Sequence, residues 1–205
     1  LHLCHHNLET INNTTSMTTT SDTLLAEVCM AAKYEGQSIK THYTPHQEKY
    51  KNTGTASQLC TVLARSFADI GDIVRGKDLF LGNTYESAQR IILDEKLKTI
   101  FKEIHSDVTT NGKTNEQTLQ ARYNDDKNNN YSKLREDWWT ANRATIWEAL
   151  TCDARNNAEY FRQTCGDSGS PSMVRDKCRC KNKKTGKSET DQVPTYFDYV
   201  PQYLR

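Results

Sequence analysis

The densest group of positive charges in the sequence lies between Arg175 and Lys187. A single acid, Asp176, accompanies seven cations there: Arg175, Lys177, Arg179, Lys181, Lys183, Lys184 and Lys187. The first five cations occupy every second position, so an extended chain projects them to one side at intervals of about 6.6–6.8 Å. Cys178 and Cys180 then point to the other side, where disulfides can hold the segment. Such a row suits a polyanion, such as a sulfated glycosaminoglycan, and the alternative is a solvated charged loop.

Two short motifs resemble enzyme loops but lack the partners that the chemistry needs. Residues 166–171 (GDSGSP) resemble the loop around the nucleophile of trypsin-type serine proteases. That reaction also needs a histidine base held by a buried aspartate, and none of the six histidines has a suitable context. Residues 184–188 (KTGKS) end like a phosphate-binding loop, but Lys181 stands where the loop requires glycine. We therefore predict that the protein is not an enzyme.

The candidate metal ligands and the candidate acid–base pair in the sequence also lack the partners that their chemistry needs. Cys4, His5 and His6 are adjacent, but the sequence has no paired C-x-x-C motifs of the kind that bind zinc. Asp69 and Asp72 share one face of a helix, yet no nucleophile or substrate clamp lies near them in the sequence. We interpret them as solvated or helix-bracing carboxylates. The sequence predicts no metal and no cofactor.

The composition indicates a folded chain with a modest core. The 205 residues include 27 Lys+Arg against 26 Asp+Glu, and 35% are hydrophobic. Aliphatic residues are scarce, as in disordered chains, but disorder also requires a large net charge, and here the charges cancel. No apolar stretch approaches the roughly 18 residues of a transmembrane helix, and no signal peptide is recognisable. The near-neutral charge disfavours nucleic acid as a partner.

Seven cysteines in so polar a chain suggest disulfides and an oxidising compartment. The odd number leaves one thiol unpaired, unless its partner lies in a neighbouring segment. We therefore favour a fragment of a larger extracellular protein. The alternative is a cytosolic protein with free, buried thiols.

Apolar residues at helical spacing predict the elements that position these groups. Four helices are expected: one from about Leu24 that ends near Gly36, one from Leu59 to Val74, one that starts at Asn83 or Thr84 and continues to about Ile104, and one from Leu134 to Cys152. Gly71 interrupts the apolar face of the second helix and permits a close helix contact or a bend there. Asn83 and Glu86 have the spacing of a capping box at the start of the third helix. Polar composition predicts loops over 12–20, 107–130 and 166–192. No stretch alternates long enough for a sheet. The predicted fold is an all-α bundle with long polar loops.

Two of the cysteines lie on the apolar stripes of these helices. Cys60 belongs to the second helix and Cys152 to the end of the fourth. Two antiparallel bundle helices can bring their Cα atoms within the roughly 4.4–6.8 Å that a disulfide requires, so we expect this pair. Cys178 and Cys180 flank a single residue and are poorly placed to bond each other. We expect them to bond Cys165 and a thiol outside this segment.

Six blocks of sequence resemble one known family. They are residues 1–11 (LHLCHHNLETI), 24–39 (LLAEVCMAAKYEGQSI), 58–83 (QLCTVLARSFADIGDIVRGKDLFLGN), 134–152 (LREDWWTANRATIWEALTC), 177–180 (KCRC) and 193–205 (VPTYFDYVPQYLR). Together they resemble the Duffy-binding-like domain, alpha class, of the var-encoded erythrocyte membrane adhesins of Plasmodium falciparum. The DIGDI and PQYLR stretches are typical of that class.

The resemblance implies a Duffy-binding-like helical fold in several lobes. An N-terminal, loop-rich lobe would occupy residues 1–55, and a helical bundle with hypervariable loops would occupy 56–205. The chain is expected to stop before the C-terminal lobe, which would account for the odd cysteine. The family also implies that Cys60 and Cys152 pair. It supplies no partner for Cys4 or Cys29.

The resemblance implies adhesion by parasite-infected erythrocytes. The domain would be the extracellular portion of a transmembrane protein, undergoing antigenic variation and taking part in rosetting or cytoadherence. The implied partners are host erythrocyte or endothelial receptors, complement receptor, heparan sulfate and other sulfated glycosaminoglycans, blood-group sugars, host antibodies and neighbouring adhesin domains. Variable loops over about 12–20, 106–130 and 153–192 would determine the ligand. The alternative is a structural head whose neighbours bind the ligand.

Overall fold

A computed structural model describes residues 19–49, 59–79, 83–110, 116–154, 158, 163–165, 169, 171–174, 177–180 and 193–205. The helices are α2 (Thr20–Lys49), α3 (Leu59–Arg75), α4 (Thr84–Thr110), α5 (Glu116–Tyr123) and α6 (Ser132–Leu150), with short 3-10 turns η1 (Asp126–Asn129), η2 (Phe197–Tyr199) and η3 (Gln202–Leu204). The predicted all-α fold is confirmed. Two short strands, β1 (Gln163–Cys165) and β2 (Ser172–Met173), form an antiparallel ribbon that the sequence did not predict.

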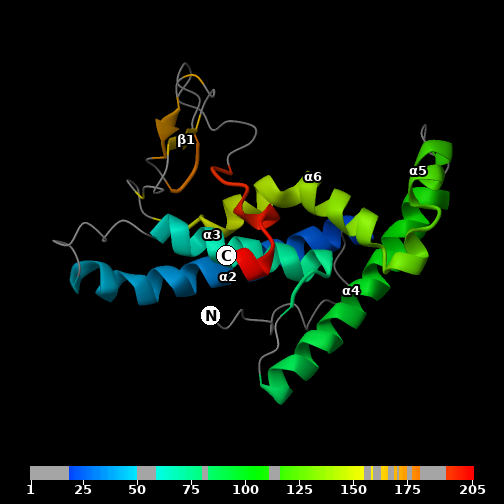
Figure 1. Cartoon of the computed structure of the whole chain (residues 1–205), viewed down its shortest axis with the longest axis horizontal. Helices are drawn as coiled ribbons and strands as arrows, with labels where there is room; N and C mark the ends of the chain where they lie inside the picture. The colour runs from blue at the N-terminus through cyan, green and yellow to red at the C-terminus, as the bar shows by residue number, and fades with distance from the viewer. Residues whose placement is uncertain are drawn as a thin grey trace.

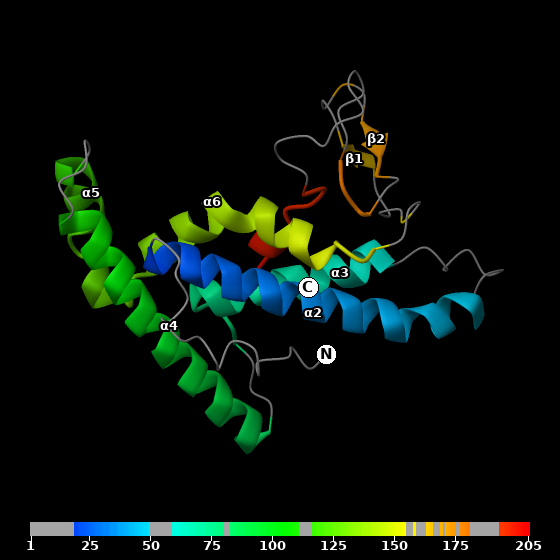
Figure 2. The same ribbon diagram turned by 180° about the vertical axis from the view of Figure 1, so that it is seen from behind.

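Three helices form the centre of the bundle. α2, α3 and α6 lie side by side, while α4 crosses them steeply and carries α5 against its C-terminal half (Figure 1). Seen from behind, the β ribbon lies beside the end of the bundle where α3 begins and α6 ends (Figure 2). Because α2 packs directly against both α3 and α6, the first described helix belongs to the same core. The proposed lobe boundary between residues 55 and 56 stays a prediction.

Two glycines allow the three central helices to approach closely. A Cβ atom on Gly71 would lie 2.8 Å from Cζ2 of Trp139, and one on Gly36 would lie 1.9 Å from the main-chain oxygen of Leu150. Of the two possibilities at Gly71, a close helix contact or a bend, the close contact is present. The expected end of the first helix near Gly36 is wrong, because α2 continues to Lys49. Gly36 gives α6 room to pack against α2 and does not terminate the helix.

The helix starts follow local capping chemistry. The backbone N–H of Glu86 donates to Oδ1 of Asn83 over 2.9 Å, which confirms the predicted cap of α4. At the start of α2, the N–H of Asp22 donates to Oγ1 of Thr19 over 3.2 Å, and that hydroxyl donates to the Asp22 carboxylate over 2.8 Å. Both caps satisfy backbone N–H groups that have no partner within the helix.

The predicted loop over 107–130 is largely helical. α4 continues to Thr110, and α5 and η1 follow it. A few specific contacts replace the missing apolar stripe: Tyr123 is buried, and its carbonyl lies 3.2 Å from Nε2 of His105. Arg122 makes two 2.7 Å hydrogen bonds to the carboxylate of Asp137 on α6. A composition-based prediction misses such a segment, because its order comes from neighbouring helices.

The disulfides differ from the expected pairing in two respects: Cys60 does not bond Cys152, and Cys178 bonds Cys60 where a thiol outside this segment was expected for one of Cys178 and Cys180. Cys60 bonds Cys178, with their Cα atoms 5.4 Å apart, and Cys152 is a free, exposed thiol. The predicted Cys60–Cys152 pair is therefore wrong. Cys152 follows the end of α6 and points to solvent, whereas Cys178 is buried against the start of α3. The expected bond between Cys165 and one of the two close cysteines is present as Cys165–Cys180.

Candidate functional site

The predicted basic segment falls partly within the described structure. Lys177 and Arg179 are described, and the other five predicted cations lie outside the described residues: Arg175, Lys181, Lys183, Lys184 and Lys187. The turn that holds Lys177 and Arg179 is fixed to the helical bundle from two sides. The Cys60–Cys178 disulfide ties it to α3, and the indole N–H of Trp147 on α6 donates to the carbonyl of Cys178 over 3.0 Å.

This turn is not extended. Lys177 and Cys178 have left-handed backbone angles, with φ of 50° and 57°. The regular alternation that would place every second cation on one side is therefore absent at these residues. A left-handed conformation is costly for residues other than glycine, and the disulfide and the Trp147 hydrogen bond hold the backbone in it.

The guanidinium of Arg179 is used in contacts within the fold, at the end of α6. Its Nε donates to Oγ1 of Thr151 over 2.9 Å, and its two terminal nitrogens contact the carboxylate and the carbonyl of Glu148 at 3.0 and 2.7 Å. The side chain is 13% exposed. Lys177 donates from Nζ to the carbonyl of Cys152 over 3.1 Å. Glu148 neutralises the charge of Arg179. The ammonium group of Lys177 has three N–H donors, so two remain beyond the hydrogen bond to Cys152 for contact with another partner.

A buried ionic network fixes the C-terminal segment onto α3 and α6. Asp198 is 1% exposed, and its carboxylate accepts hydrogen bonds from Arg143 at 2.9 and 3.0 Å and from the indole of Trp139 at 2.9 Å. Arg75, also buried, donates to the carbonyl of Asp198. Because buried charges are tolerated only when they are paired and hydrogen-bonded, this network gives residues 193–205 one defined position.

Asp69 and Asp72, weighed in the sequence as an acid–base pair, contact the same segment. Asp72 pairs with Arg75 at 3.0 Å and with Arg205, and Asp69 lies 3.5 Å from the Arg205 guanidinium. Burial raises the pKa of Asp69, and the charge of Arg205 opposes that shift. Both carboxylates thus brace α3 against residues 193–205, in agreement with the helix-bracing interpretation.

Sequence reasoning missed an exposed aromatic surface on this segment. Tyr196 is 67% exposed and Tyr199 is 39% exposed. The Arg143 guanidinium carbon lies 5.2 Å from the Tyr196 ring centre and 5.5 Å from that of Tyr199, and Arg75 lies 5.1 Å from the Tyr199 ring. Cation–π contacts with Arg143 and Arg75 therefore support one face of these two rings. Rigid tyrosines with an open face are typical of protein interfaces, and we call this pair the tyrosine surface.

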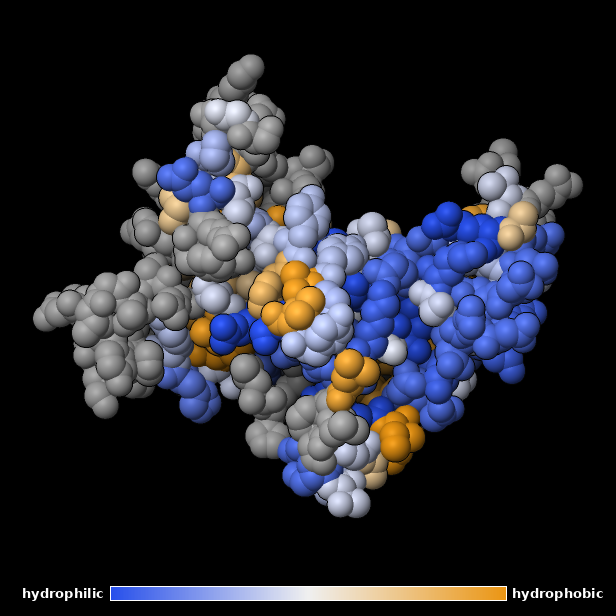
Figure 3. Space-filling model, viewed as in Figure 1, coloured by the Kyte–Doolittle hydropathy of each residue, from blue (hydrophilic) through white to orange (hydrophobic). Residues whose placement is uncertain are grey.

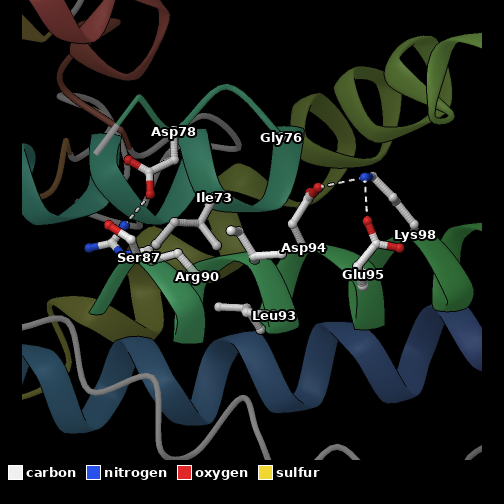
Figure 4. Close-up of a pocket in the computed structure, with 10 residues that line it drawn as sticks. Ile73, Gly76, Asp78, Ser87, Arg90, Leu93, Asp94, Glu95 and Lys98 are labelled. Carbon is white, nitrogen blue, oxygen red and sulfur yellow. Dashed lines mark hydrogen bonds and ion pairs between the residues drawn. The ribbon is translucent and has the colours of Figure 1, made fainter. Parts of the chain in front are cut away.

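A cavity of about 400 Å³ lies between the end of α3 and the first half of α4. Charged pairs occupy its sides, with Asp78 against Arg90 and Lys98 near Asp94 and Glu95 (Figure 4). Ile73, Ile91 and Leu93 are the apolar residues of its lining. This combination of apolar side chains and paired charges suits non-covalent contact with a ligand or a partner.

The surface around this cavity is divided by polarity. Hydrophobic residues gather over the C-terminal segment, the end of α3 and the first half of α4, while the second half of α4 and α5 present a hydrophilic face (Figure 3). The exposed apolar residues there include Leu79, Ile91 and Leu204. The Leu79 N–H donates to the side chain of Gln202 over 2.8 Å, so the α3–α4 connection and the C-terminal segment meet on this face.

Among the residues that the structure describes, no group of three or more His, Cys, Asp or Glu side chains is arranged to hold a metal ion. No helix within these ranges is long and apolar enough to cross a membrane.

Comparison with known proteins identifies the family of this disulfide-linked helical bundle. The family model of the Duffy binding domain matches residues 1–205, so the chain belongs to the Duffy binding domain family. No curated protein matches the sequence.

A solved structure shares the fold. It is the DBLβ domain of a PfEMP1 protein bound to human ICAM-1, with a TM-score of 0.61 and 25% sequence identity. The match covers 99% of this chain and 36% of that chain. The present chain therefore spans about a third of the length of that structure.

Proposed function

We propose that this chain is part of an extracellular adhesion domain that binds host cell-surface receptors. The observation that carries the proposal is membership of the Duffy binding domain family along all 205 residues. The similar DBLβ structure was solved with a host receptor, human ICAM-1. The tyrosine surface adds a physical basis, because rigid aromatic side chains supply contact area at a small cost in conformational entropy.

The alpha class is the finer form of this proposal. The stretches DIGDI (69–73) and PQYLR (201–205) support it. Display on infected erythrocytes, antigenic variation and rosetting through heparan sulfate, blood-group sugars or complement receptor would then follow. The basic segment is the proposed contact for sulfated glycans, with Lys181, Lys183, Lys184 and Lys187 as its main residues.

The glycan part of the proposal can be tested on immobilised heparin. We expect the chain to be retained and to elute at moderate salt, because cationic contacts with polyanions weaken as ionic strength rises. Replacing Lys181, Lys183, Lys184 and Lys187 with alanine should lower the eluting salt concentration. Arg179 is left unchanged, because it pairs with Glu148.

The matched control replaces four exposed lysines elsewhere, namely Lys33, Lys96, Lys102 and Lys127, so that the net charge changes equally. If both variants elute at the same salt concentration, retention reflects total charge and the glycan proposal is wrong. If neither the chain nor its variants bind erythrocytes, the alternative of a structural head is favoured.

The receptor part is tested separately through the tyrosine surface. A Tyr196→Ala, Tyr199→Ala double variant should lose at least about tenfold in affinity for erythrocytes, as expected for aromatic hot spots. Tyr34→Ala and Tyr85→Ala, which alter exposed tyrosines on α2 and α4, serve as controls. Equal binding by all variants would exclude the tyrosine surface as the receptor contact.

A further inference from the structure

The cavity between α3 and α4 places apolar side chains between two groups of charges. Its volume is about 400 Å³, which falls in the range of sites that hold small ligands. Ile73 and Leu93 lie in the middle (Figure 4). Asp78 and Arg90 pair at one end, and Lys98 contacts its two carboxylates at the other. A ligand can therefore meet an apolar surface and a charge within one site.

The apolar surface is fixed at its base and open at its edge. Ile73 and Leu93 are 7% and 2% exposed, so the core holds them in place. Ile91 also lines the cavity and is 64% exposed. Covering such a surface isoleucine with another apolar side chain is favourable, because it removes apolar area from water. The cavity thus offers a preformed base and an exposed edge to one apolar side chain.

The cavity lies where α3 ends, and the C-terminal end of a helix carries a partial negative charge. Arg135 on α6 neutralises part of it. Its guanidinium donates to the carbonyls of Val74 and Ile73 at 2.7 and 3.1 Å, and it contacts the Asp94 carboxylate at 3.0 Å. The Arg135 side chain is 1% exposed. Its positive charge is therefore used within the fold and does not reach the mouth of the cavity.

The charges that line the cavity contain an excess of acid. Three carboxylates, those of Asp78, Asp94 and Glu95, accompany two cations, Arg90 and Lys98. The Lys98 ammonium lies 3.0 Å from Asp94 and 2.8 Å from Glu95, so one cation serves both carboxylates. The Glu95 side chain is 65% exposed, and an exposed ion pair along one helix contributes little to stability. A ligand cation can thus bind Glu95 at a small cost.

We propose that this cavity binds a protein partner that inserts a branched apolar side chain directly beside a lysine or arginine. The apolar side chain packs against Ile73, Ile91 and Leu93, and the neighbouring cation contacts the Glu95 carboxylate at the mouth. The excess of carboxylates and the end of α3 both favour a basic partner over an acidic one.

This site is separate from the contact proposed for sulfated glycans. Cys60, which bonds the turn at 177–180, lies about 20 Å along α3 from Ile73 at 1.5 Å per residue. The basic segment that includes that turn suits a polyanion, whereas the cavity suits a cation. The chain would then hold partners of opposite charge at opposite ends of α3.

The test follows the isoleucine methyl groups of the full chain by nuclear magnetic resonance. The probe is N-acetyl-leucyl-arginine amide, which carries one branched apolar side chain beside one cation. We expect it to shift the methyl signals of Ile73 and Ile91 and to leave that of Ile146, fully buried on α6, unchanged. The matched probe, N-acetyl-leucyl-glutamate amide, should bind about threefold more weakly, as expected for one exposed charge pair.

Two substitutions separate the apolar contact from the charge. Ile91→Ala should weaken the binding of both probes equally, and Glu95→Gln should remove the preference for the arginine probe. Both positions are exposed on α4, so the helices should remain folded. The controls are Ile92→Ala and Glu103→Gln, at exposed positions on α4 outside the cavity lining. Both control variants should bind the two probes as the unaltered chain does.

Three results would overturn the proposal. The first is an absence of shifts at Ile73 and Ile91 at millimolar probe. The second is a preference for the arginine probe that is absent in the unaltered chain or survives Glu95→Gln. The third is the same set of shifts on raising the protein concentration alone, since the occupant is then a second copy of the chain. A Tyr196→Ala, Tyr199→Ala variant should bind the probe normally, which keeps this test independent of the proposed receptor contact.

Discussion

The carboxylate of Asp198 and the guanidinium of Arg143 form a buried bidentate pair that joins the C-terminal segment to α6. The two hydrogen bonds measure 2.9 and 3.0 Å, and the Asp198 side chain is fully buried. The same arginine stacks under Tyr196 and Tyr199. One ion pair therefore both closes the fold and positions the proposed receptor contact.

Replacing Asp198 with alanine should destabilise the chain strongly. Removing one member of a buried ion pair leaves the other charge uncompensated, which typically costs about 3–5 kcal/mol. Chemical denaturation followed by circular dichroism measures the change in the free energy of unfolding. Asp107→Ala, at an exposed position on α4, is the control and should change stability by less than about 0.5 kcal/mol. Equal effects of the two substitutions would contradict the role given to Asp198.

Gly36 should tolerate no side chain, whereas Gly169 should accept one. A Cβ on Gly36 would meet the main-chain oxygen of Leu150 at 1.9 Å, so α2 and α6 must separate. We expect Gly36→Ala to cost about 1–3 kcal/mol, as other overpacked interiors do, despite the higher helix propensity of alanine. Gly169→Ala has nothing within 4 Å of the new atom and serves as the control in the same thermal denaturation. A neutral Gly36→Ala would show that the helices are not closely packed there.

The ion pair between Arg122 and Asp137 should make stability depend on acid pH. Hydrogen bonds from Arg122 hold the pKa of Asp137 below its ordinary value of 3.8. A carboxyl with a lowered folded-state pKa stabilises the fold above the unfolded pKa, and this contribution disappears as the pH falls through the folded value. Asp137→Asn should therefore be less stable than the unaltered chain near pH 6.

Because this pair is partly exposed, the loss near pH 6 should not exceed about 1 kcal/mol. The difference between the two proteins should shrink as the pH falls below the ordinary aspartate pKa of 3.8 and through the lowered folded-state pKa of Asp137, because the carboxyl is then protonated in both folded and unfolded states. Urea denaturation at several pH values measures it. A difference that stays constant from pH 6 to pH 2 would show that the Asp137 charge contributes nothing.

The two disulfides should contribute unequally to stability. Cys60–Cys178 spans 118 residues and Cys165–Cys180 spans 15. Loss of chain entropy in the unfolded state predicts a stabilisation of about 4.7 kcal/mol for a loop of 100 residues and about 3 kcal/mol for one of 15. The Cys60→Ala, Cys178→Ala variant should thus unfold at lower denaturant than the Cys165→Ala, Cys180→Ala variant. The reverse order would mean that the long bridge is not maintained in solution.

Local patterns in the sequence were sufficient for the main helices. The apolar spacing from Leu59 to Val74 predicted α3, and Asn83 with Glu86 predicted the cap of α4. These features act between residues three or four positions apart, so neighbouring positions alone specify them. The excess of charged side chains over aliphatic ones likewise indicated a small core with a polar surface, and the blocks of sequence indicated the family.

Tertiary structure decided the features that depend on distant segments. From the sequence, Gly36 could either end a helix or allow another helix to pack closely against it. Only the position of Leu150 on α6 distinguishes the two roles. Cys60 was expected to bond Cys152, and only the fold shows that Cys178, 118 residues along the chain, lies against the start of α3 and forms the bond. Arg179 belongs to a basic sequence, yet Glu148 on α6 neutralises it. These disulfides and ion pairs form where segments far apart in the sequence lie side by side. Spacing along the sequence does not specify which segments become neighbours.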